Sequence, residues 1–200
     1  MEKIKVRLTF TESILGTSPN NSEIFREYIA SKAPNTATEE EECDALALNE
    51  QAEKGTSVFP RTEDGRPFIY DYQIKGMFKD ACSMLSRLKN GNESSKIKAY
   101  KKVIDGLIFP APREIPFDFD GEVGTCQRPL RAQTPQGERV ALAMSEEIPK
   151  GAQITFEVKC LDKALVPAVR EWLDYGALRG LGQWRNGGHG TFEWEEIADE

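Results

Sequence analysis

Gly180-Leu-Gly182-Gln-Trp-Arg185-Asn-Gly-Gly188-His-Gly190, close to the C-terminus, reads G-x-G, five residues, G-x-G. Glycine is favoured where the backbone needs a positive φ, or where another chain segment or a ligand comes close. Two symmetric glycine pairs therefore predict a loop that is shaped by a contact. Because Arg179 and Arg185 flank and interrupt the loop, a phosphate backbone is a natural partner. A plain glycine-rich connection between two elements would explain the same pattern.

Periodic segments on either side of this loop predict a sheet covered by helices. Residues 3–10 alternate apolar and polar side chains, which is typical of a half-buried strand, and residues 152–161 alternate in the same way. Residues 73–88 and 165–175 carry apolar residues at helical spacing. With a final strand at 191–197, this order predicts an α+β fold. It is a ferredoxin-like (RRM-like) antiparallel sheet with the helices on one face.

Further segments elaborate this sheet. The turn at Thr62–Pro67 predicts a hairpin between residues 58–59 and 68–70, and residues 128–134 and 139–144 predict a second hairpin. Residues 17–57 predict an acidic, partly helical insertion, with an exposed helix opening at Thr38. Gly76 interrupts the helix at 73–88, and a close backbone approach would explain it. No repeat or long linker is present, so we expect a single domain over 1–200.

Composition excludes several classes of protein. No run approaches the roughly 18 apolar residues of a membrane span, and no signal peptide is recognisable, so we expect a cytoplasmic protein with no membrane contact. The four cysteines form no C-x-x-C pair and the chain has one histidine. We therefore expect free thiols, no metal site and no cofactor. The net charge of −7 opposes general nucleic-acid binding, although residues 87–102 contain six basic residues against one acidic residue.

Three motifs resemble the RAMP superfamily, the CRISPR-associated RNA-binding proteins with modified ferredoxin-like folds. The glycine loop matches the family's C-terminal G-h-G-x5-G-h-G pattern, with His189 at a usually apolar position. The segment 147–158 (Glu-Ile-Pro-Lys-Gly, then Ile-Thr-Phe-Glu-Val) is similar to a strand entry of the backbone-forming subunits. The segment 67–79 is similar to their guide-RNA-contacting loop and helix start. The chain departs at Tyr70-Asp71-Tyr72, where the family has Pro-Gly-Ser, which places a carboxylate where phosphate would lie.

The resemblance implies that the chain binds single-stranded, guide-like RNA. The RNA-contacting residues that the resemblance implies are Lys75, Gly76, Lys79, Gly180, Gly182, Arg185, Gly188 and Gly190. We add the flanking Arg179 and the aromatic Trp184 to this predicted site. Glycine amides and cationic side chains bind phosphates without reading sequence, and Tyr70, Tyr72 and Trp184 would stack on bases. Alternatively, Trp184 covers the loop and the tyrosines pack at the helix start.

Two function classes stay open. The first is a non-catalytic RNA-binding subunit, which fits assembly with other CRISPR-type subunits or with its own copies in an oligomer or filament. The second is an anti-CRISPR-like interaction protein of a phage or mobile element, which mimics such a subunit and binds its protein partners. Catalysis is not expected, because His189 has no partner in sequence and neither Asp64 nor Asp71 belongs to a visible metal-binding group.

Overall fold

The computed structural model describes residues 1–19, 56–88, 91–134 and 137–198. The predicted insertion at 17–57, with its helix opening at Thr38, lies almost entirely outside these residues. The chain divides into two compact units. Unit 1 comprises Met1–Ile14, Pro60–Glu122 and Ile148–Glu200, and unit 2 comprises Leu15–Phe59 and Val123–Glu147. The single domain expected over 1–200 stays a prediction.

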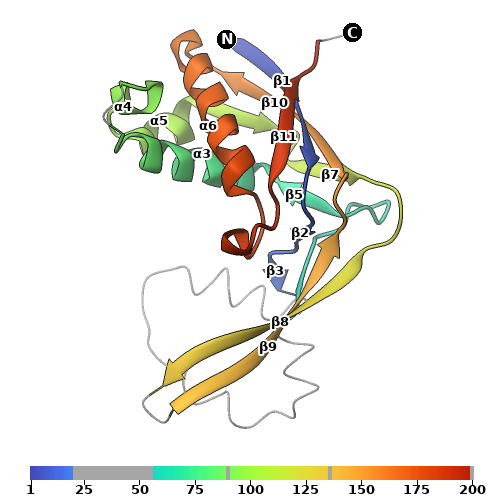
Figure 1. Cartoon of the computed structure of the whole chain (residues 1–200). Helices are drawn as coiled ribbons and strands as arrows, with labels where there is room; N and C mark the ends of the chain where they lie inside the picture. Colours follow the sequence, from blue (N-terminus) through green and yellow to red (C-terminus); the bar gives the residue numbers. More distant parts are fainter. Residues whose placement is uncertain (20–55, 89–90, 135–136, 199–200) are drawn as a thin grey trace. The chain divides into compact units, whose positions relative to one another are not determined.

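The sheet of unit 1 has β1 (Glu2–Phe10) near its centre. This strand pairs antiparallel with β10 (Gln153–Cys160) on one side and with β11 (Phe192–Glu196) on the other. Val6, for example, lies opposite both Phe156 and Glu196. The three strands predicted at 3–10, 152–161 and 191–197 are therefore confirmed as neighbours in one antiparallel sheet (Figure 1).

The remaining strands extend the sheet beyond β10. Strands β6 (Ile108–Ala111) and β7 (Glu114–Asp118) pair with successive parts of β10, and β5 (Phe68–Tyr70) pairs with β7. The elements β1, α3, β6, β10, α6 and β11 follow the chain order β-α-β-β-α-β. Their strands lie in the order β11-β1-β10-β6. The predicted ferredoxin-like α+β fold is confirmed.

The helices cover one face of this sheet (Figure 1). The principal helices are α3 (Asp71–Leu85) and α6 (Val166–Arg179). The smaller ones are α4 (Glu93–Lys96), α5 (Tyr100–Leu107) and the 3-10 turn η1 (Lys163–Leu165). The residues buried between sheet and helices are Ile4, Val6, Leu8, Phe10, Ile74, Phe78, Ile154, Phe156, Val158, Val169, Trp172 and Leu173. Burial of each large apolar side chain contributes about 1.5–3 kcal/mol, which is what fixes the helices on this face.

Two sequence-based boundaries need correction. The hairpin predicted between 58–59 and 68–70 is shorter than expected, because β5 pairs along its length with β7 and not with β4 (Ser57–Val58). The turn itself is closed by an antiparallel bridge between Arg61 and Pro67, and the Phe68 amide donates to the Pro60 carbonyl at 3.0 Å. The helix predicted to reach 88 ends at Leu85, whose carbonyl accepts a hydrogen bond from Asn92 Nδ2 at 2.7 Å. Leu88 is consequently 49% exposed.

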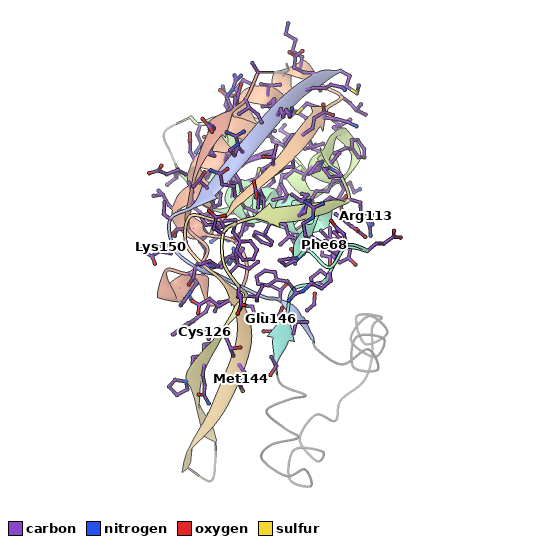
Figure 2. All side chains as sticks on the ribbon, turned by 90° about the vertical axis from the view of Figure 1, so that its right-hand side faces the viewer. Phe68, Arg113, Cys126, Met144, Glu146 and Lys150 are labelled. Carbon is purple, nitrogen blue, oxygen red and sulfur yellow. The ribbon has the colours of Figure 1, made fainter. Side chains whose placement is uncertain are left out.

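Unit 2 is built on a long hairpin of β8 (Gly124–Thr134) and β9 (Gly137–Ile148). Their register runs from Gly124 opposite Glu147 to Thr134 opposite Gly137, which confirms the predicted second hairpin. Cys126 and Met144 lie on its two strands (Figure 2). Its sheet also contains β2 (Ile14–Leu15), β3 (Ser18–Pro19) and β4. A buried contact of 2.8 Å joins the hydroxyls of Ser57 and Ser145.

Candidate nucleic-acid interface

The base of the glycine loop is closed by the chain's own backbone. The amide of Leu181 donates to the carbonyl of Gly190 at 2.9 Å, and the amide of Gly190 donates to the carbonyl of Ser13 at 2.8 Å. Gly180 and Gly190 have φ of +82° and +74°. A Cβ on Gly190 would lie 1.9 Å from the Leu181 oxygen, and one on Gly180 would lie 2.6 Å from the His189 oxygen. The contact that shapes the outer glycine pair is therefore between the two ends of the loop.

The tip of the loop contains the turn η2 (Arg185–Gly187) and a stacked aromatic pair. The ring of Trp184 lies on that of His189, with centroids 4.9 Å apart and planes 18° apart. His189 Nδ1 lies 3.0 Å from Ser13 Oγ, and a Cβ on Gly187 would lie 3.0 Å from the Trp184 ring. Trp184 thus covers part of the loop, while 45% of its surface remains exposed.

The inner glycines differ from the outer pair. Gly182 and Gly188 have φ of +80° and +89°. A Cβ on Gly188 would have no protein atom within 4 Å among the described residues. The positive φ explains why glycine is favoured at both positions, but at Gly188 no neighbouring protein segment requires it. The backbone at this position therefore faces open space.

Asp80 of α3 brings the glycine loop against the first long helix. Its Oδ2 lies 3.0 Å from an Arg185 Nη and 3.7 Å from Arg179 Nε. Arg179 also donates to Asn186 Oδ1 at 2.7 Å. Arg185 and Asp80 are 105 positions apart in the sequence. The two segments that sequence reasoning assigned to RNA binding therefore meet in the fold.

Asp105 of α5 holds the two predicted lysines of α3. Lys79 Nζ lies 2.6 Å from Asp105 Oδ1, and Lys75 Nζ donates to the Asp105 carbonyl at 3.3 Å. Lys75 Nζ also lies 4.5 Å from the centre of the Phe109 ring. Gly76, between the two lysines, is exposed and has open space around its Cα among the described residues. No described segment of the chain therefore comes close at Gly76, so the close approach expected there is not found among these residues.

The start of α3 is occupied by its own side chains. Asp71 Oδ1 accepts from the Tyr72 amide at 2.9 Å and from Arg113 at 3.3 Å, so its carboxylate meets the positive end of the helix dipole. Tyr70 and Tyr72 stack with centroids 5.1 Å apart, and Tyr70 packs edge-on against Phe68. Phe68 and Arg113 are both labelled in Figure 2. The tyrosines thus pack at the helix start, as the alternative interpretation describes.

Potential metal ligands and thiols are the other reactive groups to consider in the described part of the chain. No group of three histidine, cysteine or acidic residues there is placed to hold a metal ion. Cys82, Cys126 and Cys160 are free thiols. Burial raises the pKa of Cys160 to about 11, so this thiol stays protonated and unreactive at neutral pH. No helix within the described ranges is long and apolar enough to cross a membrane.

Sequence reasoning missed Asp80 and Asp105. Each pairs with cations from another element, and neither belongs to a motif. Asp80 directly follows Lys79 in the sequence, but adjacent residues do not face each other on a helix. Only the tertiary packing of α3 against α5 and the glycine loop reveals the roles of these two aspartates.

Comparison with known proteins supports the fold alone. No protein-family model and no curated protein sequence matches the chain. Among solved structures, the chain is similar to one in the cryo-EM structure of the Type III-B Cmr-beta bound to cognate target RNA. The TM-score is 0.55 at 11% sequence identity, with 98% of this chain and 60% of that chain covered. The likeness is one of fold, and this chain spans about three fifths of that neighbour's length.

Proposed function

We propose that the chain binds single-stranded RNA without cleaving it, as a RAMP-like protein resembling a backbone subunit of a CRISPR effector. The observation that carries the proposal is the contact of Arg185 with Asp80. Through it, the glycine loop lies against the same helix that presents Lys75, Gly76 and Lys79. RNA crossing this junction would meet both predicted segments at once.

The charge and exposure of this junction suit a phosphate backbone. Four cations stand against two carboxylates there, which leaves a local charge of +2 on a chain of net charge −7. Gly76 and Gly188 leave the backbone accessible. Trp184 is 45% exposed, and we expect this exposed surface to contact a base. Because phosphate contacts position RNA without specifying bases, we expect binding with little sequence preference.

The structural neighbour supports the proposal by analogy. It comes from a complex bound to cognate target RNA and shares the coarse fold of this chain. A fold hosts many functions, so the analogy adds weight only because the residues at the junction carry suitable chemistry.

Charge reversal tests the proposal directly. The triple variant Lys75→Glu, Lys79→Glu and Arg185→Glu should weaken the binding of labelled RNAs of different sequence by the same factor. Each phosphate contact on a single strand adds roughly 0.7 to the steepness of log K against log salt. Loss of three contacts should therefore reduce that steepness by about 2. Fluorescence anisotropy over a range of salt concentrations measures both quantities.

A matched control uses the exposed lysines beside and on α5. Lys98→Glu, Lys101→Glu and Lys102→Glu change the net charge by the same amount but leave the junction intact. A second set with glutamine in place of glutamate avoids new repulsion against Asp80 and Asp105. If the control triple weakens binding as much as the junction triple, the RNA site is not at the glycine loop.

The proposed absence of cleavage is tested in the same mixtures. Efficient cleavage needs a positioned base near neutral pKa or a metal held by grouped carboxylates. His189 instead lies stacked on Trp184 beside Ser13. We expect labelled RNA to stay intact on a denaturing gel with magnesium or manganese. Cleavage that disappears in His189→Ala or Asp71→Ala would make the chain an enzyme.

A second candidate is a protein-binding function, as in an interaction protein of a mobile element. The observation that favours it is the pairing of the junction cations with Asp80 and Asp105, which reduces the charge offered to RNA. Native mass spectrometry of the chain with purified type III effector subunits, with and without RNA, distinguishes the two. A complex that forms without RNA and survives the junction triple variant supports this second function.

A further inference from the structure

Two aspartates contact all four cationic side chains of the junction. The Asp80 carboxylate forms ion pairs with Arg185 at 3.0 Å and with Arg179 at 3.7 Å. Lys79 Nζ lies 2.6 Å from the Asp105 carboxylate, and Lys75 Nζ donates to the backbone carbonyl of Asp105 at 3.3 Å. The cations that would bind RNA phosphate are therefore already engaged within the protein. Both aspartates come from elements that face the glycine loop or α3, and neither is needed to complete the fold's apolar core.

These contacts are accessible to solvent. The side chains of Arg185, Arg179 and Asp80 are 31%, 33% and 35% exposed. Those of Lys79 and Asp105 are 32% and 54% exposed. Ion pairs in such positions are weak, because water screens them and the long side chains lose freedom when they are held. An incoming phosphate can consequently displace a carboxylate from its cation.

We propose that Asp80 and Asp105 are internal competitors of the RNA phosphate and thereby set the affinity of the site. The inference rests on the proposed RNA-binding function. In the absence of RNA, the two aspartates hold the cations in place. When RNA binds, each phosphate replaces one aspartate contact, and the displaced carboxylate stays close enough to repel it. The aspartates therefore lower the affinity of a site whose cations they also pre-position.

Neutralising the competitors provides the test. Asp80→Asn and Asp105→Asn keep the shape of the side chain but remove its charge. Each should tighten the binding of a labelled uridine-rich RNA by about two- to fivefold at low salt, since exposed pairs have strengths of this order. The double variant should bind more tightly still and show a steeper dependence on salt.

The matched control is Asp120→Asn. Asp120 is exposed in the bend between β7 and β8 and makes no ion pair with any other residue of the described ranges. The Asp120→Asn substitution removes the same charge without releasing a junction cation, so RNA affinity should change by less than about twofold. Thermal melting of each variant checks that the fold is retained.

The outcomes separate this inference from the proposed function. Weaker or unchanged binding in the Asn variants would overturn it, because the aspartates would then support the cations or have no role. If the unmodified chain binds no RNA but the double variant does, the competition stands and the proposed function of the natural chain fails. If neither binds RNA, both proposals fail.

Discussion

Glycines stand both at the base and near the tip of the glycine loop, but for different physical reasons. At the base, Gly180 and Gly190 bring two backbone segments so close that no side chain fits. At the tip, Gly188 faces open space. The second G-x-G pair thus combines Gly190, which the fold requires, with Gly188, whose surroundings are open among the described residues. A glycine motif can therefore report packing and accessibility at once, and substitution separates the two.

Substitution at the base should have the largest effect on stability. In Gly190→Ala the new Cβ would lie 1.9 Å from the Leu181 oxygen at a φ of +74°. The backbone must shift, and overpacking together with the left-handed conformation costs about 3 kcal/mol or more. Urea unfolding measures the loss, and the melting temperature should fall by roughly 10 °C. A fully stable Gly190→Ala protein would show that the loop base is not closed as described.

The same substitution at the tip should cost less. Gly188→Ala meets no described protein atom and carries only the penalty of its φ of +89°, about 1 kcal/mol. RNA affinity should fall as well, because the methyl group occupies the space that the proposed phosphate backbone needs. Parallel unfolding and anisotropy measurements compare the two effects. Equal destabilisation by Gly188→Ala and Gly190→Ala would remove the distinction between base and tip.

The smallest effect on stability is expected at the surface ion pair that links α6 to β11, the two elements that the glycine loop joins. Arg170 donates to both oxygens of Glu196, at 2.5 and 3.2 Å. This hydrogen bonding lowers the pKa of Glu196 below its ordinary value. Because the pKa of Glu196 is lower in the folded chain, the pair stabilises the fold at pH values above the unfolded pKa, near 4.5. That stability is lost as the pH falls through the folded pKa.

Arg170→Ala should therefore destabilise the protein by less than about 1 kcal/mol at pH 7, because the pair is solvent-exposed. The difference from the unmodified chain should shrink as the pH falls below about 4.5. Urea unfolding at several pH values measures it. Glu196→Gln should remove the same pH dependence. A constant difference between pH 7 and pH 3 would mean that Arg170 stabilises the link by packing alone.

The sequence predicts those parts of the fold that depend on local periodicity. The alternation from Ile4 to Phe10 identifies β1, and the helical spacing around Ile74 and Phe78 identifies α3, because each pattern matches the buried face of one element. The sequence is a poorer guide to which strands pair, as where two strands close in sequence pair with different partners. Residues 68–70 pair with 114–116, and the turn at 62–67 gives no sign of that choice.

The candidate site shows the same division. The cations Lys75, Lys79 and Arg185 stand in recognisable motifs, whereas their partners Asp80 and Asp105 do not. Electrostatic partners depend on side chains from distant elements meeting in space, so they have no fixed spacing along the chain. The role of Gly190 was similarly hidden, because the backbone that it touches belongs to the other end of its own loop.

The acidic outer strand limits how copies of this chain can assemble. Among the described residues β11 pairs only with β1, and Glu193, Glu195 and Glu196 on it are exposed. An antiparallel copy centred on Trp194 would set Glu193 opposite Glu195, and like charges in that position are destabilising. That register is therefore disfavoured for a second copy that pairs with β11 at this edge.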